Sequence, residues 1–292
     1  MTAEETFEPL RGTLIGFCYR MLGSVSDAED IVHDAYLRWE QAGRPSLDAP
    51  RSWFLKVCAR LCLDQWKSAR AQRESYYGEW LPEPFLPDSF DQVELDETVS
   101  IALMLTMERL KPAERAAFLL HDVFGYEFTE VAEMLGLEAA HCRQLAVRAR
   151  AHLRGDKTRA AIDRDAVQRV SDAFFSAVKQ GDLAALQQVL AEDVVLRSDG
   201  GGKVPAALVP IVGADRVIRF VTGVFRKAGQ QQAVELRPVW FNGAPGMAVF
   251  VGSELASAYQ LELAGGRVCS IYIHRNPDKL RAIAVGATTA EA

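Results

Sequence analysis

"SVSDAEDIVHDAYLRWEQA" (residues 24–42) combines a helix-start signal with a helical pattern of apolar residues. Ser26 has Glu29 three positions later, which is the spacing of a capping box at a helix N-terminus. Five apolar residues then recur at helical spacing and predict one buried stripe: Ala28, Ile31, Val32, Ala35 and Trp39. The charged residues face elsewhere, and a solvated surface is the ordinary interpretation of such a helix face.

The segment that follows, residues 51–74, predicts a second helix with a strongly basic side. It carries six Lys or Arg residues between positions 51 and 73 and one acid, Asp64. Its other side is lined at helical spacing by Phe54, Val57, Cys58, Leu61 and Gln65. Basic side chains on phosphates give affinity without choosing a sequence. This side is therefore a candidate DNA surface, although the net charge of the chain is −6.

Within the first helix, "DAEDIVHDAYLRW" resembles the polymerase-binding helix of sigma-70-family initiation factors, especially the extracytoplasmic-function (ECF) type. That resemblance implies docking on a coiled coil of the largest subunits of RNA polymerase. The residues that it assigns to this contact are Asp27, Glu29, Asp30, Asp34, Tyr36, Leu37 and Arg38.

The basic helix is similar to the promoter −10 helix of the same family. The DNA contacts that this implies are Arg51, Trp53, Arg60, Lys67, Arg70 and Arg73. Arg60 stands where Asn is common, at a position that helps to hold a flipped-out base, so the preferred −10 base stays open. Two interpretations of Trp53 stay open: contact with the promoter and packing in the core.

A second helical part covers residues 98–157 and has the pattern of a helix-turn-helix. Pro112 suits a helix start, Gly125 and "LGL" interrupt the pattern, and a recognition helix is expected from about Glu138 to Leu153. This part resembles the sigma −35 domain, although Glu127 and Glu138 stand where Ser or Thr often caps a helix. The expected DNA contacts are Ala139, Ala140, His141, Arg143, Gln144, Arg148 and Arg150. For His141 two other interpretations stay open: an exposed surface residue without a contact, or a functional titratable group.

Between the two helical parts lies an acidic linker, residues 76–97. "WLPEPFLPD" (residues 80–88) places three prolines in nine residues, which predicts extended backbone. We interpret it as a tether between a −10 reader and a −35 reader. "WLPEP" also resembles the linker of the ECF subgroup with a fused C-terminal domain.

The C-terminal third, residues 163–285, predicts three helices followed by four strands. Gly265–Gly266 is expected to form a hairpin turn between the last two strands. This order indicates an antiparallel α+β fold and resembles a SnoaL-like cone. The expected fold class is thus multidomain, with two all-α sigma domains, residues 1–75 and 98–157, and this cone.

Three short motifs match the pattern of that subgroup in order: "WLPEP", "DGGGK" and "NPDKL". By resemblance, the extension replaces a separate anti-sigma protein and modulates transcription in cis. The residues expected at this regulatory contact are Trp80, Leu81, Pro82, Glu83, Pro84, Asp199, Gly200, Gly201, Gly202, Lys203, Asn276, Pro277, Asp278, Lys279 and Leu280. "DGGGK" lacks the spacing of a Walker motif, so nucleotide binding is not expected.

Two other functions stay open at this point. A helix-turn-helix regulator with a ligand-sensing domain leaves "DAEDIVHDAYLRW" unexplained. An isomerase or cyclase would need convergence of four groups in an apolar pocket: Asp199, Tyr259, Tyr272 and His274.

The leading interpretation is a sigma factor whose partners are core RNA polymerase and promoter DNA. We expect no catalytic residue, cofactor, metal or membrane span, and leave open a small ligand of the cone. The acidic N-terminus and the odd count of five Cys suit the cytoplasm. Cys58 and Cys62 share a helix face and are open between burial and redox or metal use.

Overall fold

A computed structural model describes residues 6–44, 47–86, 99–153, 164–281 and 283–284 of the chain. The chain divides into two compact units. The first comprises residues 1–75 and 87–158, and the second comprises residues 76–86 and 159–292. None of the helices within the described ranges is long and apolar enough to cross a membrane.

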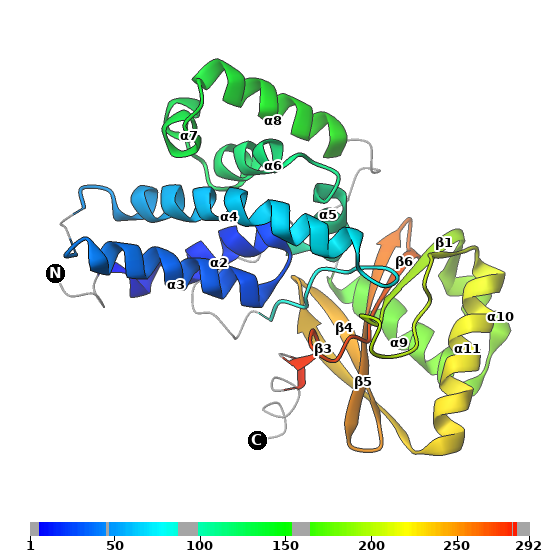
Figure 1. Cartoon of the computed structure of the whole chain (residues 1–292). Helices are drawn as coiled ribbons and strands as arrows, with labels where there is room; N and C mark the ends of the chain where they lie inside the picture. Colours follow the sequence, from blue (N-terminus) through cyan, green and yellow to red (C-terminus); the bar gives the residue numbers. More distant parts are fainter. Residues whose placement is uncertain (1–5, 45–46, 87–98, 154–163, 282, 285–292) are drawn as a thin grey trace. The chain divides into compact units, whose positions relative to one another are not determined.

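The first unit begins with three helices that pack on one another (Figure 1). They are α2 (Glu8–Leu22), α3 (Val25–Gln41) and α4 (Pro50–Glu74). The buried residues of α3 are the five predicted ones, so its amphipathic pattern is confirmed. The predicted cap was wrong. Ser24 caps the helix by accepting a hydrogen bond from the Asp27 amide, because Gly23 ends α2 one residue earlier and Ser26 is already helical.

The second half of this unit contains the helix-turn-helix, and its helices α6 and α7 pack against α4 (Figure 1). Pro112 begins a helix as predicted, and Gly136 ends α7 in the left-handed conformation that glycine favours. The elements are α5 (Ile101–Met107), α6 (Pro112–Phe118), the π-helical turn η3 (Leu119–Val123), α7 (Phe128–Leu135) and α8 (Ala139–Leu153).

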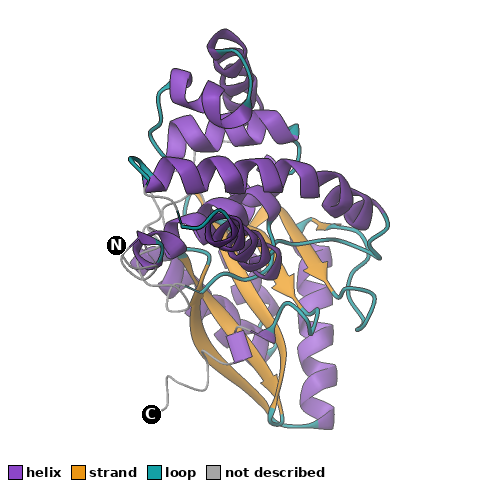
Figure 2. Cartoon of the chain, turned by 60° about the vertical axis from the view of Figure 1, so that its left-hand side comes forward, coloured by secondary structure: helices purple, strands orange, loops and turns teal. Residues whose placement is uncertain are grey.

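The second unit is a six-stranded sheet with helices against one face (Figure 2). The helices are α9 (Arg164–Gln180), α10 (Leu183–Val189) and α11 (Ala214–Gln231). The strands are β1 (Leu190–Asp199), β2 (Ile211–Val212), β3 (Val234–Phe241), β4 (Ala244–Val251), β5 (Glu254–Ala264) and β6 (Arg267–His274). Their order across the sheet is β2-β1-β6-β5-β4-β3.

The two faces of the sheet bury different apolar clusters, because successive side chains of a strand point to opposite faces. On β4, Met247 and Val249 join the core beneath the helices, whereas Ala248 and Phe250 lie on the other face. Residues from distant parts of the chain cover that second face: Leu86, Leu280 and Ile283.

The expectation of a purely antiparallel sheet was wrong. β1 pairs with β6 in parallel, and it precedes α11, whereas the predicted strands all followed the three helices. Helix α10 ends at Val189, where Leu190 takes up extended backbone. The predicted Gly265–Gly266 hairpin is confirmed between β5 and β6, and both glycines have positive φ.

Candidate functional site

Helix α3 presents a line of charged side chains on its exposed face. Asp30, Asp34 and Arg38 are exposed and lie four residues apart, so they follow one another along the helix. Glu29 is exposed beside them, 3.9 Å from the Arg11 guanidinium. The other residues predicted to bind polymerase are half-buried: Asp27, Tyr36 and Leu37.

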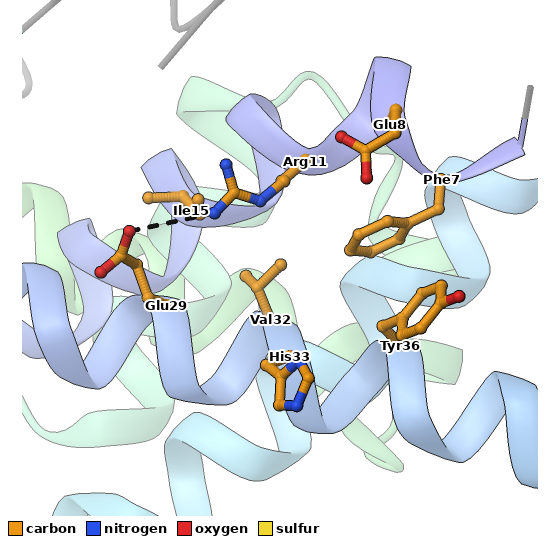
Figure 3. Close-up of a pocket in the computed structure, with 8 residues that line it drawn as sticks. All are labelled: Phe7, Glu8, Arg11, Ile15, Glu29, Val32, His33 and Tyr36. Atoms are coloured by element: carbon orange, nitrogen blue, oxygen red, sulfur yellow. Dashed lines mark ion pairs between the residues drawn. The ribbon is translucent and has the colours of Figure 1, made fainter. Parts of the chain in front are cut away.

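A cavity of about 450 Å³ opens between α2 and α3 on the Glu29 side of this face (Figure 3). Phe7 and Tyr36 meet at its wall with their ring centroids 4.9 Å apart. Its lining mixes apolar and charged side chains: Phe7, Glu8, Arg11, Ile15, Glu29, Val32, His33 and Tyr36. The cavity therefore adjoins two of the residues predicted to bind polymerase, Glu29 and Tyr36.

The predicted −10 residues of α4 are partly engaged by the helix-turn-helix half. The Arg60 Nε donates to the carbonyl of Met134 at 3.3 Å, near the end of α7. The Arg51 guanidinium lies over the ring of Tyr126, 5.7 Å from its centroid. Trp53 is half-buried, and the side chains of Lys67 and Arg70 lie outside the described residues.

Arg73 belongs to a buried cluster that joins the two halves of the unit. It pairs with Glu108 and donates to the carbonyl of Leu22. Arg115, fully buried, pairs with the same Glu108 at 2.6 Å. Both guanidiniums lie over the ring of Trp66, 5.3 and 5.1 Å from its centroid. Burial lowers the pKa of Arg73, which nevertheless stays charged.

Helix α8 exposes most of the residues predicted to contact −35 DNA. The exposed ones are Ala140, His141, Arg143, Gln144 and Arg148. Ala139 is half-buried, and Arg150 is held by Asp122 at 2.7 Å.

The prediction missed Val147, whose side chain is 58% exposed on the same helix. An exposed apolar residue three positions after Gln144 could contact a thymine methyl group. At helical spacing it shares a face with the exposed Gln144 and lies next to the exposed Arg148, which was the signal in the sequence.

In the second unit the first half of the linker lies on the sheet. We call Tyr76–Leu86 the linker strap. The buried carboxylate of Asp199, at the end of β1, accepts hydrogen bonds from the Tyr76 hydroxyl at 2.5 Å and the Leu81 amide at 2.9 Å. Burial and the Asp199 carboxylate raise the pKa of Tyr76, so its hydroxyl remains a donor. The strap is thus bound through a side chain of the "DGGGK" motif.

Lys279 of "NPDKL" holds the same part of the strap. Its ammonium donates to Asp199 at 2.7 Å and to the carbonyl of Leu81 at 2.5 Å. It also lies over the rings of Trp80 and Tyr76, 4.6 and 5.1 Å from their centroids. Such contacts stabilise a desolvated cation by about 0.5–2 kcal/mol each.

The glycines of "DGGGK" allow the motifs to approach closely. Gly201 and Gly202 have positive φ, and a Cβ on Gly201 would lie 2.3 Å from the Asn276 side chain. Asn276 in turn donates to the Tyr76 hydroxyl at 2.9 Å. Side chains are therefore excluded from this turn by backbone conformation and by space.

The remaining predicted regulatory residues lie around this contact. Pro82, Pro84 and Leu280 are buried, and Glu83 is half-buried. Lys203 forms an exposed ion pair with Asp278.

The far end of the strap is held by a residue that the prediction missed. The side-chain oxygen of Asn242 accepts a hydrogen bond from the backbone amide of Phe85 at 2.9 Å. The backbone amide of Asn242 donates to the carbonyl of Phe85 at 2.8 Å. Asn242 has φ +49 in the turn between β3 and β4. "NG" flanked by strand-forming residues is a hairpin signal and would have marked this turn. A second missed contact is the ion pair of Arg197 with Glu79.

The four groups considered for an isomerase site do not converge. The Asp199 carboxylate is occupied by the strap. His274 lies opposite Asp199 in the register of β1 and β6. Tyr259 lies in the core on the opposite face, where burial raises its pKa to about 12. The Tyr272 hydroxyl donates to Glu262 at 2.9 Å.

The thiols of Cys58 and Cys62 are buried beside Cys18, and all three are free. Burial and these two neighbours raise the pKa of Cys18, so its thiol is protonated and unreactive. The described residues contain no group of three or more His, Cys, Asp or Glu placed to hold a metal ion. This environment favours the burial interpretation.

Residues 6–72 match the family model of Sigma-70 region 2, and residues 100–153 match that of Sigma-70, region 4. Over 94% of its length the chain is 37% identical to the ECF RNA polymerase sigma factor SigJ of Mycobacterium tuberculosis, of which it covers 91%. The chain belongs to the ECF sigma factors. The probable ECF sigma factor SigI of the same species is 34% identical, with 92% of each chain covered. The crystal structure of SigJ matches with a TM-score of 0.76, at 35% identity over 95% of this chain and 98% of that one.

Membership in this family assigns a role to each half of the first unit. Region 2 binds core RNA polymerase and the promoter −10 element, and region 4 binds the −35 element. The second unit corresponds to the SnoaL-like extension of SigJ. The fold class expected from the sequence is confirmed apart from the parallel strand pair.

Proposed function

We propose that the C-terminal domain controls this sigma factor by binding the linker strap and restraining the linker between regions 2 and 4. The observation that carries the proposal is Asp199, a fully buried carboxylate that accepts from Tyr76, Leu81 and Lys279. Charge-assisted hydrogen bonds of this kind are strong when desolvated. Two motifs far apart in the sequence thus serve one purpose, which is to hold the strap.

Control requires two states that differ by a few kcal/mol. In the bound state the strap follows the sheet, and only the rest of the linker is free to span between promoter elements. In the released state the whole linker, with the acids Glu79 and Glu83, is available to the basic nucleic-acid channels of polymerase. The linker cannot reach those channels while the strap is bound to the sheet. Release of the strap therefore raises transcription.

The first unit adds a restraint of its own. Region 4 is joined to the region 2 helices by the ion pair of Glu108 with Arg73 and by the hydrogen bond that Arg115 donates to the carbonyl of Arg20 at 2.7 Å. In addition, Arg60 is occupied by the backbone of α7. A −10 surface engaged in this way must separate from region 4 before it meets promoter DNA. Polymerase binding to α3 supplies the free energy for that opening.

In this proposal the extension is regulatory and the protein is not an enzyme, because Asp199 holds the strap, Tyr259 faces the opposite core and the Tyr272 hydroxyl is bound to Glu262. It acts in the cytoplasm, where RNA polymerase works. Residues 1–75 and 98–157 are its sigma domains, 76–97 its linker and 163–285 its regulatory domain. Residues 87–98 and 154–163 lie outside the described residues.

The test is transcription in vitro with core RNA polymerase and mapped start sites. Asp199→Asn replaces a buried carboxylate by an amide that cannot satisfy all of its donors, so we expect higher promoter output than with the wild type. Asp193→Asn is the matched control, because Asp193 is exposed on the same strand. A fragment cut after Gly155 should also differ from the full chain. Equal output from all four proteins at equal abundance would refute the proposal.

A further inference from the structure

His274, at the end of β6, is buried without a hydrogen-bond partner. Its side chain is fully buried, and neither ring nitrogen has a partner among the residues that the structure describes. The ring of Phe241 meets it edge-on with the centroids 5.7 Å apart. Burying an imidazole in this way costs free energy, and burying its charged form would cost much more.

The strap covers the sheet face on which His274 lies. Directly paired residues of adjacent strands share a face, and His274 pairs with Asp199 on β1 and with Ala258 on β5. Ala258 belongs to the apolar cluster that Leu86 of the strap covers together with Leu280 and Ile283. His274 is therefore shielded from water by the strap and by the segment after β6.

The charges that act on His274 come from two elements, β1 and the segment after β6. Asp199 faces it from β1 and favours its charged form, whereas Lys279 from the segment after β6 opposes that form. Burial is the largest influence and lowers the pKa of His274 to about 3. The titratable groups of the strap are Tyr76, Tyr77, Glu79 and Glu83; Tyr76 is bound to Asp199 and Glu79 to Arg197. From β5 the paired residue is the uncharged Ala258.

We propose that His274 makes the grip on the linker strap sensitive to acid, so that a fall in pH releases the strap. The inference rests on the proposed function for its effect on transcription, but the release itself is independent of it. In the bound state His274 is neutral. Once the strap and the segment after β6 lift away, the imidazole meets water and takes up a proton.

The sign follows from the two protonation states. A histidine whose pKa is lowered in the bound state stabilises that state above its exposed pKa of about 6.5, and this stability is lost as the pH falls below 6.5. With pKa values of about 6.5 exposed and about 3 bound, the released fraction grows roughly ten-fold between pH 7.5 and pH 5.5.

The experiment measures strap release directly by hydrogen exchange of the full chain at pH 7.5 and 5.5. The amides of Leu81 and Phe85 report on the strap, because Asp199 and Asn242 hold them. Their exchange rates are divided by the intrinsic rate at each pH. We expect protection of both amides to fall about ten-fold in the wild type. We also expect no such fall in His274→Leu, which removes the titrating ring at similar volume, or in His274→Gln, which serves if the first variant does not fold.

Two controls separate this mechanism from general acid effects. His152→Leu removes an exposed histidine of α8 and should keep the wild-type response. The amide of Ile271, within β6, reports on the sheet and should stay protected at both pH values. Strap protection that is equal at both pH values, or that falls equally in His274→Leu and His274→Gln, would overturn the inference. A fall that extends to Ile271 would overturn it as well.

Transcription assays on the same proteins distinguish the two proposals. Acid release of the strap without a change in promoter output would refute the proposed function and leave the inference standing. Higher promoter output from Asp199→Asn, together with strap protection that does not change with pH, would refute the inference and leave the proposed function standing.

Discussion

Replacing Lys279 by methionine removes the buried ion pair of Lys279 with Asp199, the two residues that bind Leu81 of the strap. Lys279→Met keeps the apolar stem but removes the ammonium that binds Asp199 and the Leu81 carbonyl and lies over two aromatic rings. The side chains of Lys279 and Asp199 are 13% and 0% exposed, so solvent cannot compensate for the lost charge. Removing one partner of a buried pair costs about 3–5 kcal/mol.

A matched control exists in the same domain. Lys203 pairs with Asp278, but those side chains are 55% and 46% exposed. An exposed pair contributes about 0–1 kcal/mol, so Lys203→Met should change the strap little. The comparison holds residue type and substitution constant and changes only the burial of the ion pair.

The assay is hydrogen exchange of the Leu81 and Phe85 amides at pH 7.5, with urea unfolding to verify that the domain remains folded. A cost of about 4 kcal/mol corresponds to a drop in protection of roughly 10³-fold. Lys203→Met should stay within about five-fold of the wild type. Loss of protection within five-fold for both variants would refute the reasoning that burial makes the Lys279 pair strong.

Three further predictions concern the sigma regions. Charge reversal of Asp30 and Asp34 to arginine should weaken binding to core polymerase at least ten-fold in a pull-down titration, with an unchanged melting temperature because both side chains are exposed. Glu108→Gln leaves two guanidiniums without their carboxylate and should lower the free energy of unfolding by about 3 kcal/mol in urea; unchanged stability would refute this. Gln144→Ala should weaken −35 binding by about 1–3 kcal/mol in a fluorescence titration, and equal affinity would remove it from the interface.

Local patterns predicted the helices well. The stripe of α3, the start of α6 at Pro112 and the end of α7 at Gly136 all depend on residues close together in the chain. The helix cap at Ser24 was mistaken for Ser26 because both serines lie before the same apolar stripe. Only the backbone conformation, extended at Ser24, decides between them.

Long-range pairing limited the prediction of the sheet and of the strap contact. β1 pairs with β6 across more than 70 residues, and no local signal in "LAEDVVLRSD" announces that partner. The motifs around Asp199 and Lys279 were located by resemblance, but their hydrogen bonds to the strap depend on three segments meeting in space. Asn242 was missed for the same reason, although its turn could have been predicted.

The order of the strap and its binding residues along the chain has a consequence for protein synthesis. The strap leaves the ribosome long before Lys279, with almost two hundred residues still to be translated. At 5–20 residues per second, this interval lasts roughly 10–40 s. In the later part of it, once region 4 has also been translated, both promoter-reading regions exist without the residues that bind their linker. A nascent chain, or one cleaved near its C-terminus, therefore lacks the restraint that the finished molecule carries.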